Sequence, residues 1–140
     1  METEFFLAMQ PPTITQQEKR ITVVKGKPLV YEDKRLQAAR SKLLAHLGPQ
    51  APPRPYEQGV GLHVKWCFAL TGKHRDGEYR VSKPDTDNLQ KLLKDVMTTL
   101  HFWRDDALVA LEVCEKFWAA IPGIYIHIWE LAEVGQDDGE

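Results

Sequence analysis

Two short acidic segments contain the side chains best suited to chemistry in this chain. The first is Lys83-Pro84-Asp85-Thr86-Asp87-Asn88-Leu89-Gln90-Lys91, and the second is the pair Asp105-Asp106. Carboxylates are hard oxygen ligands of the kind that Mg²⁺ prefers, usually together with waters and substrate phosphate. An Asp-x-Asp pair in extended chain places both side chains on one side. We therefore expect a magnesium site, provided that Asp106 returns to the neighbourhood of Asp85.

Each of these residues also has an ordinary structural explanation. Asp87 stands where a helix N-cap belongs, with Gln90 three residues later in a capping-box pattern, and Asp85 after a proline is typical of turns. Asp105 is suited to cap a turn, and Lys91 would by default be a solvated surface lysine. Together, however, Asp-x-Asp-Asn, a lysine four residues after the second aspartate, and a later Asp pair form a combination that chance rarely supplies.

The elements that must position these residues follow from hydrophobic spacing. Apolar residues over 89–100 recur at helical intervals, which predicts an amphipathic helix of about three turns between the two acidic segments. A second helix is predicted from Asp33, as its N-cap, to just before Gly48. β-Rich sequence predicts strands over residues 4–9, 62–70, 108–118 and 124–131.

The connections complete the predicted topology. The last two strands flank Pro122-Gly123 and are expected to pair as a hairpin. Residues 21–24 and 29–31 flank Lys25-Gly26-Lys27, which predicts a two-stranded excursion around a turn. Residues 71–83 are polar and contain two glycines, so they should form a mobile loop.

The order of these elements predicts a single α+β domain over residues 1–131, with a mixed β-sheet and two main helices. An acidic, disordered tail should follow over residues 132–140. The three carboxylates would converge if the strand that follows Asp106 starts beside the end of strand 62–70.

Composition restricts the class of protein. One hundred and forty residues with 43% hydrophobic and 27% charged content are ordinary for one soluble domain. No stretch approaches the ~18 apolar residues of a membrane helix, and the N-terminus lacks the basic charge of a secretory signal. Cys67 and Cys114 fit reduced thiols. We therefore expect a cytoplasmic protein without a membrane partner. The chain contains no Gly-x-x-x-x-Gly-Lys-Ser/Thr motif, so no nucleotide cofactor is expected.

Positive charge is concentrated in the middle of the chain, although the formal net charge is −2. Residues 19–94 contain 16 Lys or Arg against 7 Asp or Glu, a local excess of +9. A basic body with grouped carboxylates suits an enzyme that binds phosphates and a metal ion, although charge alone fits an ordinary solvated surface equally well. The candidates for contacts with a DNA backbone are Lys19, Arg20, Lys25, Lys27, Lys73, Arg75, Arg80 and Lys83.

The two acidic segments resemble the signature of a known family. Asp85-Thr86-Asp87-Asn88-Leu89-Gln90-Lys91 and Phe102-Trp103-Arg104-Asp105-Asp106-Ala107, with their separation, are similar to the central motifs of the RusA family of Holliday junction resolvases. Pro11-Pro12-Thr13 resembles that family's N-terminal motif more weakly, and the resemblance covers residues 5–131. It implies a RusA-like fold and a bacterial member of phage or prophage type. It also implies that Asp85, Asp87 and Asp106 bind Mg²⁺ for catalysis and that Lys91 is needed for cleavage.

By the same resemblance the protein would be a homodimeric crossover junction endodeoxyribonuclease. It would resolve four-way junctions and related branched DNA by paired symmetric nicks during recombination and repair. Two other functions stay open: a DNA-junction binding module that does not cut, and a small interaction protein with a basic face. The complete set of three aspartates and Lys91 speaks against the binding module. Candidates for the dimer interface, although a core position explains most of them better, are Phe117, Trp118, Tyr125 and Trp129.

Overall fold

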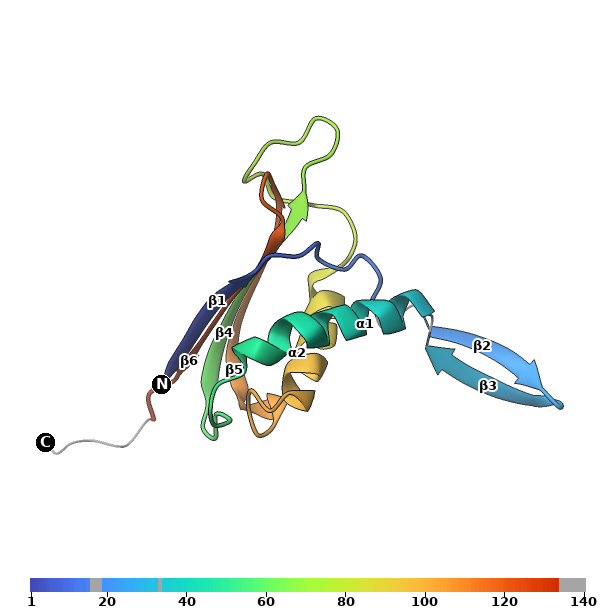
Figure 1. The fold of residues 1–140 in the computed structure, drawn as a ribbon, viewed down its shortest axis with the longest axis horizontal. Coiled ribbons are helices and arrows are strands. Elements are labelled where there is room, and N and C mark those ends of the chain that lie inside the picture. Colours follow the sequence, from blue (N-terminus) through green and yellow to red (C-terminus); the bar gives the residue numbers. More distant parts are fainter. Residues whose placement is uncertain (16–18, 33, 134–140) are drawn as a thin grey trace, which may run out of the picture.

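The computed structural model describes residues 1–15, 19–32 and 34–133, and its main body is a four-stranded sheet packed against two helices (Figure 1). The sheet has the order β1-β6-β4-β5. β4 pairs in parallel with β5 and antiparallel with β6, and β6 pairs antiparallel with β1. The predicted single α+β domain with a mixed sheet and two main helices is confirmed. The four strands are β1 (Glu2–Leu7), β4 (Val60–Ala69), β5 (Val109–Ala119) and β6 (Gly123–Glu130).

Both helices contribute to one hydrophobic core on a single face of this sheet. They are α1 (Lys34–Leu47) and α2 (Thr86–Thr99), and their leucines pack against alternate side chains of the central strands. On β4, Leu62, Val64 and Trp66 are fully buried, whereas the residues between them face the other side of the sheet. Within the described ranges, neither helix is long and apolar enough to cross a bilayer.

A small two-stranded sheet projects from the N-terminal end of α1, away from the main sheet (Figure 1). It consists of β2 (Lys19–Val24) and β3 (Lys27–Glu32), which confirms the predicted excursion. Lys25 and Gly26 turn the chain with positive φ angles of 52° and 79°, as a tight hairpin requires. Asp33 lies outside the described residues, as does most of the predicted acidic tail, so that N-cap and that tail stay predictions.

The predicted hairpin between the last two strands is wrong. Both strands exist, but β4 lies between them and pairs with each. The crossover through α2 returns the chain so that β5 runs parallel to β4, as parallel neighbours require. The short connection over residues 120–122 then leads past the end of β4 to β6. β5 begins beside Val60, at the start of β4, and not beside its end as predicted.

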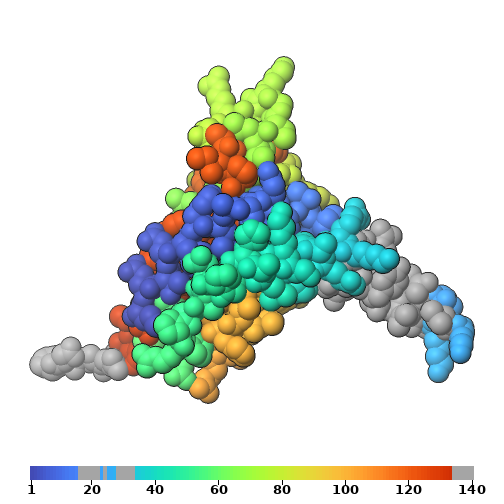
Figure 2. All heavy atoms as spheres, viewed as in Figure 1, coloured from blue at the N-terminus to red at the C-terminus, as the bar shows by residue number. Residues whose placement is uncertain are grey.

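The long connection between β4 and α2 is attached to the outer edge of β5. It has no regular secondary structure, as predicted, and its first half forms the projection at the top of Figure 2. Its second half makes backbone hydrogen bonds to β5, from Gly77 N to Trp118 O, from Trp118 N to Glu78 O and from Arg80 N to Lys116 O, at 2.8 to 2.9 Å. The expectation of a mobile loop therefore does not hold for residues 77–80.

Candidate active site

The first acidic segment enters α2 in extended conformation at Asp85. The backbone angles of Asp85, φ −73° and ψ 148°, make it the N-cap residue, and Leu89 N donates to Asp85 O at 3.1 Å. Asp87 therefore lies in the first helical turn, and the N-cap and capping box predicted from Asp87 and Gln90 are wrong. Lys91 follows Asp87 by four residues, so the two side chains lie on one face of the helix.

The second acidic segment is held in place by a turn built on buried aromatic residues. Phe102 and Trp103 follow α2 and are fully buried, and the Trp103 indole donates to Thr98 Oγ1 at 2.7 Å. Tyr56 N donates to Phe102 O at 2.9 Å, which attaches the turn to the chain before β4. Asp105 then caps a short 3₁₀ turn, η2 (Asp106–Leu108), because its carboxylate accepts from Ala107 N at 2.8 Å. Asp106 is thereby placed just before β5.

α2 and the start of β5 enclose a cleft of about 540 Å³. Three of the four predicted catalytic residues, Asp87, Lys91 and Asp106, line it. Asp85 does not line the cleft, but it directly precedes Thr86, which does. The structure thus brings together two acidic segments that are about four helical turns apart in sequence. The complete lining is Thr86, Asp87, Gln90, Lys91, Lys94, Asp95, Asp106, Glu112 and Cys114.

A second set of polar side chains in the cleft is bound to the protein itself. Glu112 on β5 accepts from Gln90 Nε2 at 2.6 Å and from Lys94 Nζ at 2.9 Å. The Gln90 amide oxygen accepts in turn from the Trp66 indole at 2.8 Å. Sequence reasoning missed this network. The signal that could have indicated it is the alternation of side chains along β5, which places Glu112 and Cys114 on the same face of the strand. Cys114 also faces the cleft, and burial raises the pKa of its thiol to about 12.

The predicted catalytic groups differ from this network. Among the described residues, no hydrogen bond or ion pair engages the carboxylate of Asp85, Asp87 or Asp106, or the Lys91 ammonium group. All four side chains are exposed. The polar groups at the cleft therefore divide into a fixed network and a set that is available to a ligand, and the available set matches the residues predicted from the sequence motifs.

Comparison with known proteins identifies the family of this chain. Residues 10–129 match the family profile described as Endodeoxyribonuclease RusA. The chain is also 35% identical over 111 residues to the crossover junction endodeoxyribonuclease rusA of Lactococcus phage r1t, and the alignment covers 78% of this chain and 83% of the phage protein. The chain belongs to the RusA family. The prediction of a RusA-type endodeoxyribonuclease is thereby confirmed.

Whether the cleft of this RusA-family protein fits a divalent cation depends on its donor set. Asp87 and Asp106 offer hard oxygen atoms without protein partners among the described residues, which suits Mg²⁺. However, no three Asp, Glu, His or Cys side chains in the part of the chain that the structure describes lie close enough together to hold a metal ion. The predicted convergence of three carboxylates is therefore incomplete in the described part of the chain.

The predicted DNA-binding residues of the RusA chain lie in two regions, the β2–β3 hairpin and the connection between β4 and α2. Lys25 and Lys27 are exposed at the β2–β3 turn, while the side chains of Lys19 and Arg20 lie outside the described residues. The second group belongs to the connection between β4 and α2. There, Lys73, Arg75 and Lys83 are exposed, whereas Arg80 is half-buried and its guanidinium lies over the rings of Phe68 and Trp118, at 4.3 and 4.6 Å from their centroids.

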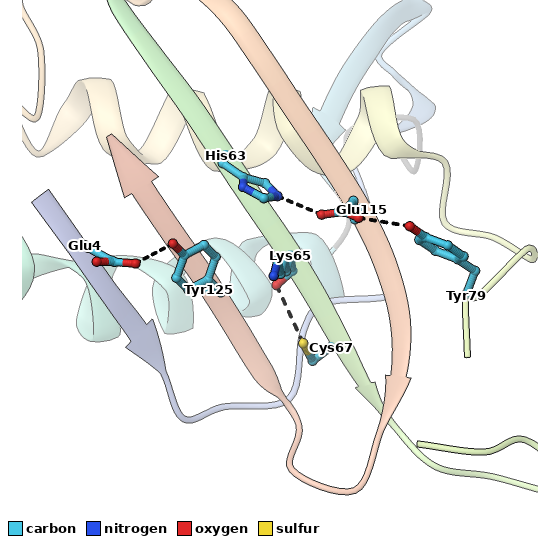
Figure 3. A network of polar contacts seen from close by, with 7 residues as sticks. All are labelled: Glu4, His63, Lys65, Cys67, Tyr79, Glu115 and Tyr125. Atoms are coloured by element: carbon cyan, nitrogen blue, oxygen red, sulfur yellow. Dashed lines mark hydrogen bonds and ion pairs between the residues drawn. The ribbon is translucent and has the colours of Figure 1, made fainter. Parts of the chain in front are cut away.

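Figure 3 shows a separate group of polar contacts on the sheet face opposite the helices. His63 Nε2 donates to Glu115 Oε1 at 2.7 Å, and the Tyr79 hydroxyl donates to Glu115 Oε2 at 3.0 Å. The bond from His63 lowers the pKa of Glu115. The Tyr125 hydroxyl donates to Glu4 at 2.5 Å, and this bond raises the pKa of Tyr125 to about 12. None of these residues lines the cleft, so the two networks belong to opposite faces of the sheet.

Proposed function

We propose that this RusA-family crossover junction endodeoxyribonuclease resolves four-way DNA junctions with Mg²⁺ held by Asp85, Asp87 and Asp106. In the proposal Lys91 acts on the scissile phosphate. The observation that carries it is the cleft in which Asp87, Asp106 and Lys91 lie together without protein partners among the described residues. A protein that only bound DNA would gain nothing from unpaired carboxylates where phosphate must approach.

Phosphodiester hydrolysis needs an attacking water and neutralisation of the negative charge that develops on the phosphate oxygens. Bound Mg²⁺ would supply Lewis-acid stabilisation of that charge and would lower the pKa of a water. Lys91 projects from the same helical face as Asp87, so its ammonium group donates to a non-bridging phosphate oxygen and neutralises part of the charge. Asp85 and Asp87 lie at the N-terminus of α2, where the helix dipole favours negatively charged groups.

The exposed cations of the hairpin and of the connection between β4 and α2 would hold the arms of the junction. Lys25 and Lys27 on the hairpin, together with Lys73, Arg75 and Lys83, are exposed and would contact backbone phosphates. Such contacts give affinity that falls with salt, and they do not select a sequence. This activity on DNA would place the protein in the cytoplasm.

We further infer that the protein acts as a homodimer. A four-way junction has two symmetry-related scissile phosphates, so paired nicks call for two active sites related by a twofold axis. In the described residues no helix covers the sheet face that carries Phe117, Tyr125 and Trp129, and Leu111 on the same face is 43% exposed. We assign the dimer interface to this face. Trp118 is 8% exposed and belongs to the core on the other face of the sheet. A core position is what the sequence analysis favoured for most of the four aromatic candidates.

A cleavage assay on a synthetic four-way junction tests the proposal, with Asp106→Asn and Asp105→Asn as a matched pair of neighbours. The parent should give symmetric nicks only with Mg²⁺. Asp106→Asn should bind the junction but cut it more than ~100-fold more slowly, because it removes a proposed metal ligand. Loss of a residue that only orients a metal ligand already costs about 10–100-fold in activity. Asp105→Asn keeps an oxygen that accepts from Ala107 N and should cut at close to the parent rate.

The possible results separate the three functions. Equal cleavage by the parent and Asp106→Asn would contradict the metal site. Binding by the parent without product would identify a junction-binding module, and the absence of any gel shift would identify an interaction protein. Sedimentation of the parent should give the mass of a dimer, and a monomer that still makes paired nicks would contradict the assigned interface.

A further inference from the structure

The segment that leads into Asp85 is held by a lysine from the sheet. Lys116 Nζ donates to Ser82 O and to Pro84 O, both at 2.7 Å. Lys116 is half-buried on β5 and lies in register with Trp66 of β4, on the face that packs against the helices. Two of the three ammonium hydrogens are therefore bonded to the backbone immediately before the first proposed metal-binding aspartate.

Arg80 completes this attachment from within the segment. Its guanidinium group donates to Lys83 O and, at 3.2 Å, to Ser82 Oγ, while it lies over the rings of Phe68 and Trp118. Arg80 N donates in turn to the carbonyl oxygen of Lys116 at 2.9 Å. Three successive carbonyl groups, of residues 82 to 84, thus accept from two cations that are themselves joined through the backbone.

The position of Lys116 on β5 links the two halves of the site. β5 directly follows Asp106 and η2, so the strand that carries Lys116 also fixes the second acidic segment. Further along the cleft, Glu112 of the same strand is bonded to Lys94 of α2 at 2.9 Å. The segment that leads into α2 is therefore tied to β5 through Lys116, and α2 itself is tied to β5 near its middle through Glu112.

We propose that Lys116 is a positioning residue for the cleavage reaction: with Arg80, it holds the carbonyl groups of residues 82–84 and so fixes Asp85 relative to Asp106. The inference rests on the proposed role of Asp85 in binding Mg²⁺. Lys116 does not line the cleft, so it acts on the reaction only through the backbone that it holds. Displacing a reacting or metal-binding group by about 1 Å is enough to cost on the order of 100-fold in rate.

Three variants and a charge control test this role. Lys116→Met removes the ammonium group and keeps a side chain of similar length, and Lys116→Arg retains charged donors. Lys42→Met removes one lysine from the exposed part of α1, outside the cleft, and measures the effect of the lost charge on DNA binding. Asp85→Asn tests the residue on which Lys116 is proposed to act. Each variant is assayed for single-turnover cleavage, for junction affinity in EDTA, and for Mg²⁺ affinity by calorimetry without DNA.

Lys116→Met should cut roughly 10–100-fold more slowly and bind Mg²⁺ about 10-fold more weakly. Losses of this size are typical when a residue that orients a metal ligand is removed. Its junction affinity in EDTA should stay within about threefold of that of Lys42→Met, because each loses one charge. Lys116→Arg should recover most of the rate. Cleavage and Mg²⁺ affinity of Lys116→Met equal to those of the parent would overturn the proposal. So would a loss of rate, junction affinity and melting temperature in equal proportion, which marks a general role in folding.

The same experiment separates failure of this inference from failure of the proposed metal site. If Asp85→Asn cuts at the parent rate, the proposed role of Asp85 is wrong and Lys116 has no metal ligand to position. If Asp85→Asn is inactive but Lys116→Met retains full rate and Mg²⁺ affinity, the metal site stands and the role of Lys116 alone is refuted.

Discussion

The hydrogen bond between Trp66 and Gln90 should contribute strongly to the stability of the cleft wall. The Trp66 indole is fully buried, and the Gln90 side chain, which accepts its N–H at 2.8 Å, is 4% exposed. Gln90→Met leaves that N–H without its partner and removes one donor from the Glu112 carboxylate. An unpaired buried donor costs about 1–3 kcal/mol, and a bond to a charged group contributes a similar amount. We expect a loss of about 3 kcal/mol in the free energy of unfolding and a Tm lower by roughly 10 °C.

A double-mutant cycle with Trp66→Phe isolates the hydrogen bond from the cavity that each substitution creates. Urea unfolding of the parent, the two single variants and the double variant gives the four free energies that the cycle needs. Because the double variant leaves no unpaired indole N–H, it should lose about 1–2 kcal/mol less than the two single variants together. Simple additivity of the two losses, or a Gln90→Met variant as stable as the parent, would refute the reasoning.

Three further results follow from the structure. The Cys114 thiol, with a pKa of about 12, should resist iodoacetamide at pH 8 in the folded protein and react once the protein is unfolded, as mass spectrometry would detect. The pKa of Glu115 is lowered in the folded state, mainly by its bond from His63, so its stabilising contribution is complete above the ordinary pKa of 4.5 and is lost as the pH falls through the lowered value. The Tm of the parent should therefore fall toward that of Glu115→Gln on acidification below 4.5, and a constant difference would count against the pair. A Cβ atom on Gly61 would lie 2.3 Å from the Trp129 ring, so Gly61→Ala should lower stability by about 1–3 kcal/mol, whereas Gly48→Ala, with open space around it, should not.

The parts of the fold that are encoded locally could be predicted from the sequence. The apolar stripe of α2 is a repeat over the twelve residues 89–100, so the helix and the acidic segments at its two ends were visible without any tertiary information. The strands at residues 109–119 and 123–130 were recognisable from their β-branched and aromatic residues in the same way.

Strand order could not be read from the same signals. A short connection after Trp118 predicts a hairpin, but β4 offers β5 and β6 a buried partner on either side, and this depends on contacts that are distant in sequence. The misplacement of the α2 N-cap has a local cause, because Asp85 and Asp87 are equally good N-cap residues. Lys116 and Glu112 were missed since their roles depend on which face of β5 meets α2, and the register settles that face only once β5 is paired with β4.

The charges that line the cleft explain why DNA affinity and cleavage should depend on different residues. Four carboxylates, those of Asp87, Asp95, Asp106 and Glu112, stand against only two ammonium groups, those of Lys91 and Lys94. The lining therefore has a formal excess of two negative charges, which repels the phosphate that must be cut. The exposed lysines and arginines outside the cleft attract the backbone of the DNA as a whole. A divalent cation has the charge that cancels the excess. Loss of an aspartate should therefore suppress cleavage without weakening binding, whereas loss of an exposed basic residue outside the cleft should weaken binding more than cleavage.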